Sequence, residues 1–323
     1  MSAGGELVNF QNVATLRKLG WRAVVLLDDT SQVEMPSRPF SVPMVQHGAA
    51  LKFAPHDVVV MPEVTPLPAW RTMAQQCRVV MHNQNPFYTF RSFDSMQALN
   101  TFGLFGALCC SSFTREVLQR WGSTIDWQVV QPFVLPVFAQ AGQQPGVQRK
   151  RQIAFMPRKR PAEAQLLKSM FVSMYPQLAD VPWIEISNMG RAQVAQVLAE
   201  SQVFASLSHL EGLGLPPLEA MAAGCLVAGF TGQGGVTYAT PENGRWVAEG
   251  DLEALVHALA ADVQADVSTV DRRRAAGQAT VARFDVAQFE ASLNAAWLHV
   301  LGDEAAQYRL PQHANGLETA NVA

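Results

Sequence analysis

The sequence has 323 residues, of which 49% are hydrophobic, and its formal net charge at pH 7 is −3. This length favours two domains of about 100–200 residues each, which can bury hydrophobic cores without metals or disulfides. The slightly acidic balance argues against a general nucleic-acid-binding protein, which would be distinctly basic. Four cysteines (Cys77, Cys109, Cys110 and Cys225) show neither CxxC nor zinc-like spacing, so we expect reduced thiols in a cytosolic protein.

The first twenty residues lack the basic start and the apolar stretch of a signal peptide. Because no run of about 18 apolar residues occurs, we expect no membrane-spanning helix and a cytoplasmic location. The N-terminal half could contact the inner face of a membrane peripherally, although no strongly basic amphipathic helix is present.

In the N-terminal half, short apolar segments alternate with helix-like segments. Apolar residues spaced by three predict a helix over residues 5–20, and Gly20 lies where a C-cap is expected. Further patterns predict strands over 21–29, 56–63, 77–84, 107–112 and 127–134, and a helix over 113–122. Short apolar strands separated by helices indicate a parallel sheet covered on both faces, with ligands beyond the carboxyl ends of the strands.

A stretch rich in Gln, Gly and Pro interrupts this alternation at residues 139–151, and we interpret it as an interdomain linker. The alternation then restarts with predicted strands over 152–156, 183–187, 202–208 and 225–230, and helices over 161–175, 191–201, 251–263 and 284–301. The predicted fold class is α/β, with two facing Rossmann-like domains. The predicted parts are an N-terminal domain at 1–140, a linker at 141–151, a C-terminal domain at 152–284, a last helix at 285–301 and a disordered tail at 302–323.

The N-terminal domain starts in an unusual way, because the helix comes almost at once and Gly4 and Gly5 precede it. A doubly wound domain normally begins with a strand, a glycine turn and then a helix. We therefore expect that the first strand is missing, either because the true start lies upstream or because the domain is trimmed.

The segment HLEGLGLPPLEAMAAG, residues 209–224, places two acids, Glu211 and Glu219, with seven residues between them. The preceding strand is expected to end near Ser208, so that Glu211 lies in the loop beyond it. Two prolines suit the first turn of a helix, which would contain Glu219. The amino end of a helix attracts phosphate, and a carboxylate beside it can accept two hydrogen bonds from a vicinal diol such as ribose.

Glycines and acids in such positions also occur for structural reasons alone, but their combination is specific. The stretch EGLGLPPLEAMAAGCLV resembles the signature of retaining GT-B glycosyltransferases of glycosyltransferase family 4, the glycosyl transferases group 1. The glycine loop, the turn and the helix over residues 232–259 resemble the same family. The resemblance is strong from about Gln152 onward and only architectural before it.

This resemblance implies a nucleoside-diphosphate sugar as donor substrate and no separate cofactor. Glu219 would hold the ribose hydroxyls, while Glu211 would act near the reacting centre of the donor sugar. Arg158 and Lys159 are the best matches to the family's basic residues on the diphosphate, with Arg160 as an alternative. His82 would lie beside the donor sugar as a second catalytic candidate, although a strand-end histidine can equally be structural. The remaining donor-binding candidates are Gly212, Gly214, Leu215, Gly234, Gly235, Gly4 and Gly5.

The resemblance also implies that the last helix crosses back onto the N-terminal domain, which would bind a glycan or lipid-linked acceptor. The sequence lacks an Asp-x-Asp motif, a zinc-like cluster and a P-loop, so we expect no metal. The predicted activity is transfer of a sugar to an acceptor hydroxyl in surface polysaccharide or glycolipid synthesis. The alternatives are a GT-B sugar-nucleotide epimerase and a degenerate subunit that binds sugar nucleotide, or a partner transferase, without catalysis.

Overall fold

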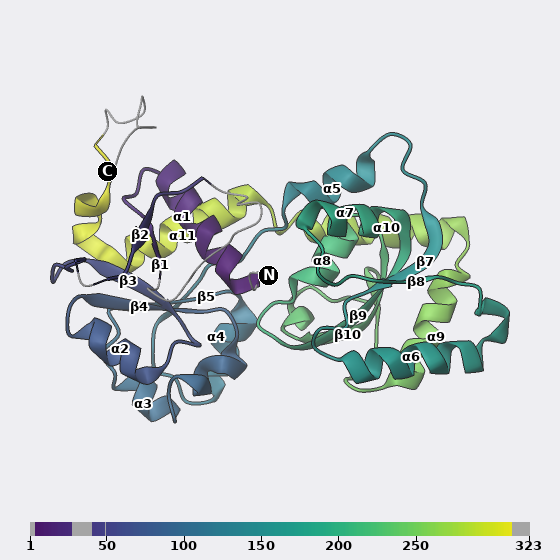
Figure 1. The fold of residues 1–323 in the computed structure, drawn as a ribbon, viewed down its shortest axis with the longest axis horizontal. Coiled ribbons are helices and arrows are strands. Elements are labelled where there is room, and N and C mark those ends of the chain that lie inside the picture. Colours follow the sequence, from purple (N-terminus) through teal and green to yellow (C-terminus); the bar gives the residue numbers. More distant parts are fainter. Residues whose placement is uncertain (1–3, 28–40, 49, 312–323) are drawn as a thin grey trace.

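The computed structural model describes residues 4–27, 41–48 and 50–311. They form two lobes that lie side by side, each with a parallel sheet and helices on both of its faces (Figure 1). The predicted α/β class with two Rossmann-like domains is therefore confirmed. None of the described helices is long and apolar enough to cross a membrane.

The N-terminal sheet has the strand order β3-β4-β5-β6, with all neighbours parallel. Its strands are β3 (Val58–Pro62), β4 (Arg78–Asn83), β5 (Gly106–Cys109) and β6 (Trp127–Val129). Because side chains alternate along a strand, Met81 packs into the core with Trp70, whereas Val80 packs into the opposite core with Phe289. The first face carries α2 (Leu67–Ala74), α3 (Met96–Asn100) and α4 (Ser112–Arg120); the second carries α1 (Gly4–Lys18) and α11 (Val286–Leu301).

The start of the N-terminal lobe differs from the expected pattern. The strand predicted over 21–29 is found only at β1 (Val25–Leu27), which pairs in parallel with β2 (Met44–Gln46) in a separate two-stranded sheet. Gly4 and Gly5 lie in the first turn of α1, so the predicted glycine loop is the start of a helix. Residues 28–40, which include the adjacent acids Asp28 and Asp29, lie outside the described residues.

The C-terminal sheet has the order β11-β10-β9-β7-β8, again with all neighbours parallel. Its strands are β7 (Lys150–Phe155), β8 (Trp183–Glu185), β9 (Ser201–Glu211), β10 (Leu226–Gln233) and β11 (Gly244–Trp246). One face is covered by α6 (Pro161–Met174) and α9 (Leu252–Val263), and the other by α5 (Pro136–Gln143), α7 (Arg191–Glu200) and α8 (Leu215–Ala222). Helix α10 (Val267–Val281) packs on α8.

The chain crosses between the lobes earlier than the composition suggested. The stretch 139–151, expected to be an irregular linker, contains the end of α5 and the start of β7. Helix α5 packs on the second lobe, where Phe138 and Ala141 join a core with Leu198 and Met221. The backbone N–H of Val134 donates to the carbonyl of Phe284 at 3.0 Å, so the outgoing and returning segments lie side by side.

The returning segment leads into α11, which packs on the N-terminal sheet beside α1 (Figure 1). The residues after it are more ordered than expected, because Gly302–Tyr308 form a 3-10 helix. The guanidinium of Arg309 then stacks 3.5 Å from the ring centre of Trp21, a cation–π contact that fixes this segment. The prediction of a disordered tail from residue 302 is therefore wrong up to residue 311, and residues 312–323 lie outside the described part.

Candidate active site

The segment between the two acids lies at the carboxyl edge of the C-terminal sheet, but both acids are shifted from their expected places. Strand β9 extends to Glu211, which pairs in register with Gln233 of β10, so Glu211 ends the strand instead of lying in the loop. Helix α8 begins at Leu215 because Gly214, with φ +85°, forms its N-cap. Glu219 is therefore the fifth residue of α8, in its second turn, and the prediction of a first-turn position is wrong.

Helix α8 also offers fewer donors to an anion than an ordinary helix start. Its second and third residues, Pro216 and Pro217, have no backbone N–H. Of the first four positions, only Leu215 and Leu218 can donate. Charge for a bound diphosphate must therefore come largely from side chains.

Lys159 is a basic side chain that reaches Glu211 at this edge. Its Nζ lies 2.8 Å from Oε1 of Glu211, and both side chains are mostly buried, with 19% and 22% exposed. The same Nζ donates to the carbonyl of His209 at 2.9 Å. The turn after β7 thus places Lys159 in direct contact with Glu211, the first acid of the motif.

The two arginines beside Lys159 behave differently. Arg160 is buried, caps α6, pairs with Glu163 and Glu249, and stacks over the ring of Phe230 at 4.9 Å. Its charge is thus already engaged within the protein. Arg158 is exposed and takes part in none of the ion pairs found among the described residues. Of the three adjacent cations, Lys159 contacts Glu211 itself, whereas Arg160 reaches the first residue of the motif, with its Nη2 2.7 Å from Nδ1 of His209.

Glu219 pairs with a residue that the sequence reading missed. The Nη1 of Arg191, the first residue of α7, lies 3.4 Å from Oε1 of Glu219. Burial raises the pKa of Glu219 above its ordinary value, and the charge of Arg191 and its hydrogen bond counteract part of this rise. Arg191 follows the loop after β8 and so lies at the same sheet edge, a position that could have marked it as a candidate.

The glycines of the motif let chain segments approach one another. A Cβ on Gly212 would lie 2.1 Å from the carbonyl oxygen of Gln84 in the other lobe, and one on Gly234 would lie 2.5 Å from the carbonyl carbon of Gly212. The hydroxyl of Tyr238 donates to the carbonyl of Gly214 at 2.6 Å. A Cβ on Gly235 would lie 3.1 Å from that hydroxyl oxygen. The structure brings these four glycines together beside Glu211, and direct contact of their backbones with a donor stays a prediction.

On the N-terminal side, Gly5 approaches the motif only through Gln84, whose Nε2 donates to the Gly5 carbonyl at 3.1 Å. The backbone N–H of Gln84 donates to the carboxylate of Glu63 at 3.2 Å, and burial raises the pKa of Glu63 to about 7. Glu63 directly follows β3, a position that the sequence reading did not use.

His82 lies near the end of β4, and only 1% of it is exposed. Burial lowers its pKa to about 4, so the imidazole is neutral at pH 7. Neither ring nitrogen has a hydrogen-bond partner among the described residues. Among the described residues, no hydrogen bond therefore links the His82 ring to Glu211 or to Lys159.

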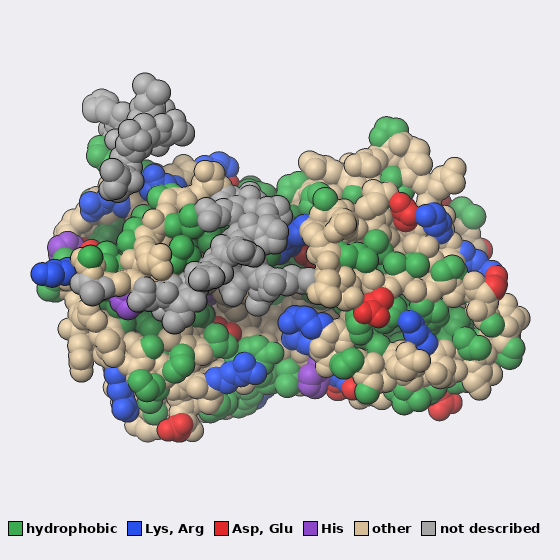
Figure 2. Space-filling view, viewed as in Figure 1, with side chains coloured by type: hydrophobic (Ala, Val, Ile, Leu, Met, Phe, Trp, Pro, Cys, Tyr) green, Lys and Arg blue, Asp and Glu red, His purple; other side chains and the backbone are tan. Residues whose placement is uncertain are grey.

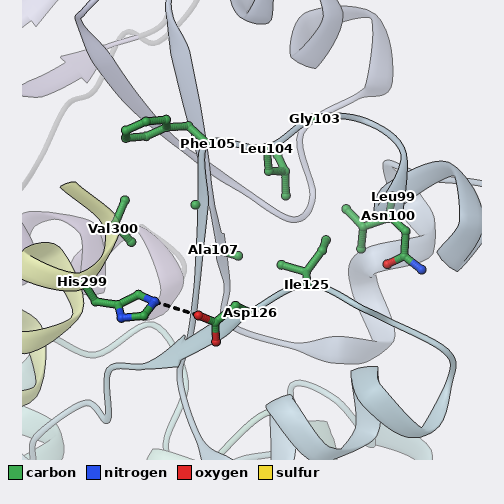
Figure 3. Close-up of a pocket in the computed structure, with 11 residues that line it drawn as sticks. Leu99, Asn100, Gly103, Leu104, Phe105, Ala107, Ile125, Asp126, His299 and Val300 are labelled. Carbon is green, nitrogen blue, oxygen red and sulfur yellow. Dashed lines mark hydrogen bonds and ion pairs between the residues drawn. The ribbon is translucent and has the colours of Figure 1, made fainter. Parts of the chain in front are cut away.

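A pocket of about 300 Å³ lies elsewhere, between β5, the residues before β6 and α11 (Figure 3). It is lined by Gly106 and by the exposed pair Asp126 and His299, which are 2.7 Å apart. Gly106 and Asp126 mark the amino ends of β5 and β6, and His299 lies on α11. Because α/β folds bind ligands at the carboxyl ends of strands, this pocket is a poor candidate for the active site.

The carboxyl edges of the two sheets meet at the boundary between the lobes, where Asn85 and Ser111 donate hydrogen bonds to the carbonyls of Leu210 and Gly212. Basic side chains lie beside this boundary on the molecular surface (Figure 2). No group of three or more His, Cys, Asp or Glu that could hold a metal ion occurs within residues 4–27, 41–48 and 50–311. The prediction that no metal takes part stays a prediction.

Comparison with known proteins gives this arrangement a family. Residues 184–279 match the family described as glycosyl transferases group 1. The chain is 36% identical over 253 residues to an alpha-1,6-glucosyltransferase of Actinobacillus pleuropneumoniae serotype 7 (strain AP76), covering 77% of this chain and 76% of the relative.

Solved structures agree in fold. A glycosyltransferase from Rickettsia africae ESF-5 is similar, with a TM-score of 0.69 and 14% identity over 94% of this chain and 97% of that one. The pneumococcal O-GlcNAc transferase GtfA, solved in complex with UDP and GlcNAc, is similar with a TM-score of 0.56 and 13% identity over 78% and 58% of the two chains. The chain belongs to the glycosyl transferases group 1 family, and it is a glycosyltransferase with the GT-B fold.

Proposed function

We propose that this enzyme is a retaining transferase of glycosyltransferase family 4 that moves a sugar from a nucleoside-diphosphate donor to an acceptor hydroxyl. The observation that carries the proposal is the pairing of each motif acid with its own cation: Glu211 with Lys159, and Glu219 with Arg191. Both pairs lie at the carboxyl edge of one sheet, where α/β folds bind their ligands. Two carboxylates and two cationic side chains suit a ligand that combines hydroxyl groups with a diphosphate.

In this proposal, Lys159 exchanges its contact with Glu211 for the diphosphate, because the first turn of α8 lacks two of its N–H donors. Glu219 accepts hydrogen bonds from the ribose hydroxyls, and Glu211, released from Lys159, contacts the donor sugar. Arg158 lies one residue away, exposed, as a second candidate for the diphosphate. Such charge-assisted hydrogen bonds are worth about 1.5–3 kcal/mol each.

The reaction proposed is a front-face displacement. The bond between C1 of the sugar and the diphosphate oxygen breaks while the acceptor oxygen bonds to C1 on the same face. The acceptor proton passes to the leaving diphosphate, whose developing charge Lys159 stabilises. Neither glutamate acts as a covalent nucleophile in this scheme, and no metal is required.

The name of the 36%-identical relative makes a glucosyl donor the first to test, and the complex of the pneumococcal enzyme makes UDP the first nucleotide. The acceptor would be a glycan or a lipid-linked glycan in surface polysaccharide or glycolipid synthesis. A thermal-shift panel of UDP, GDP, dTDP and ADP with their sugars would identify the donor class, because a ligand stabilises the state that it binds.

The test of the site is the variant Glu219→Gln. Losing the charged acceptor on the ribose should weaken binding of the selected nucleotide about 10–100-fold by calorimetry. Glu253→Gln is the matched control, because Glu253 lies on α9 with 74% of its side chain exposed. Equal affinity of Glu219→Gln and wild type would contradict the site. Conversion of the donor to an epimeric sugar nucleotide without any acceptor would instead favour the epimerase.

A further inference from the structure

The backbone on both sides of Glu211 is held by the opposite lobe. The Nδ2 of Asn85 donates to the carbonyl of Leu210 at 2.6 Å. The Oγ of Ser111 donates to the carbonyl of Gly212, also at 2.6 Å. These two hydrogen bonds bracket a single residue, the first acid of the motif, and both come from the N-terminal lobe.

Both donors are fixed in advance by bonds within their own lobe. The Oδ1 of Asn85 accepts from the backbone N–H of Phe87 at 3.1 Å, and Asn85 is only 6% exposed. Ser111 is the N-cap of α4, its Oγ accepts from the backbone N–H of Thr114 at 3.0 Å, and it is 1% exposed. Each side chain thus uses its acceptor locally and its donor across the boundary.

The segment that they hold is conformationally unusual. Leu210 has a φ of +45°, a left-handed conformation that costs a non-glycine residue roughly 1–2 kcal/mol. Its carbonyl also lies 3.4 Å from Nζ of Lys159, so the cation of the site and the amide of Asn85 share one acceptor. One backbone atom, the carbonyl oxygen of Leu210, therefore takes part both in the contact between the lobes and in the surroundings of the Lys159–Glu211 pair.

The approach of the lobes at this point depends on a missing side chain. A Cβ at position 212 would lie 2.1 Å from the carbonyl oxygen of Gln84 and 2.8 Å from Sγ of Cys110. Any residue other than glycine would hold the lobes apart here. The close approach of the lobes and the placement of the backbone beside Glu211 thus depend on the same glycine.

We propose that Asn85 and Ser111 are positioning residues that act through the backbone on Glu211. Through these two hydrogen bonds the N-terminal lobe sets the position of Glu211 for transfer. The proposal rests on the donor-site role of Glu211 proposed above. Without the two hydrogen bonds the nucleotide still binds to the C-terminal lobe, but the sugar is not held for transfer.

The decisive variant is Asn85→Asp, which keeps the acceptor for Phe87 and replaces the donor to Leu210 with a second acceptor. We expect turnover of UDP-glucose, or of whichever panel member stabilises the protein most, to fall at least tenfold. The affinity for the free nucleoside diphosphate should change less than threefold. Asn100→Asp is the matched control, because Asn100 donates to the Gly122 carbonyl and accepts from the Thr124 N–H within one lobe.

Gly212→Ala provides a second test that leaves every hydrogen-bonding group in place. We expect a larger radius of gyration than that of the wild type by small-angle scattering in the presence of the donor. Gly48→Ala is its control, since a Cβ there would have no atom of the described residues within 4 Å. Wild-type turnover of Asn85→Asp, or an unchanged scattering curve of Gly212→Ala, would overturn this inference. If Glu219→Gln binds nucleotide normally, the proposed function itself fails, whatever these variants do.

Discussion

Arg191 shows how a single cation can set the charge of a binding carboxylate. Burial raises the pKa of Glu219, and the charge of Arg191 is the strongest of the influences that lower it. Without this charge, the pKa of Glu219 should rise further, so a higher pH is needed to ionise it. Because the ionised form accepts both ribose hydrogen bonds, nucleotide affinity should increase with pH across the titration of Glu219.

We therefore predict that Arg191→Met shifts the pH profile of nucleotide binding toward higher pH, with affinity reduced several-fold where Glu219 is ionised in the wild type but not in the variant. Calorimetry over a pH series that starts at the ordinary pKa of a carboxyl group and extends upward would measure the shift. Arg191→Lys, which keeps the charge, should restore most of the wild-type profile, and Arg71→Met on α2 of the other lobe serves as control. A uniform loss of affinity at every pH would mean that Arg191 acts only as a structural contact.

At the level of the element, α5 shows why composition alone misassigned the linker. Its residues Ala139–Gln143 are poor in large apolar side chains, and Gly and Gln usually mark loops. Yet a Cβ on Gly142 would lie 2.5 Å from the backbone carbonyl oxygen of Ala223, so the small residues allow α5 to pack closely at the end of α8. Packing against another element stabilises α5 as a helix, and the local sequence gives no sign of this packing.

Gly142→Ala should accordingly destabilise the protein by about 1–3 kcal/mol, the usual cost of overpacking. The sign of this change in stability is informative, because alanine in a helix interior is otherwise favoured over glycine by about 1 kcal/mol. Urea unfolding of this variant and of Gly48→Ala would measure the difference. A Gly142→Ala protein at least as stable as wild type would show that α5 does not press on α8.

The C-terminal half was the easier part to predict, because its buried strands are short apolar runs separated by regular helices. The errors there are small and local: the left-handed Leu210 lets β9 reach Glu211, and the cap at Gly214 starts α8 at Leu215. The pairs Lys159–Glu211 and Arg191–Glu219 join residues far apart in sequence. The sequence pointed to both residues of the first pair, but only to Glu219 of the second. The hydrogen bonds of Asn85 and Ser111 to this segment could not be predicted in this way, since their partners lie in the other lobe.

At the scale of the whole molecule, the two lobes form one catalytic unit. The chain leaves the N-terminal lobe before α5 and returns through α11, and the two crossing segments are hydrogen-bonded to each other at Val134 and Phe284. The N-terminal lobe then touches the C-terminal lobe at the carbonyls of Leu210 and Gly212, the two neighbours of Glu211. This architecture suits a transferase that must exclude water until both substrates are in place.

The central claim, transfer of a sugar with retention at this site, is tested most directly by the anomer that the enzyme first releases. Slow hydrolysis of UDP-glucose, or of the panel donor that binds best, can be followed by proton NMR before the free sugar mutarotates. The front-face reaction predicts that the first sugar released has the same anomeric configuration as the donor, and that Lys159→Met slows its release. Release of the opposite anomer would contradict the account.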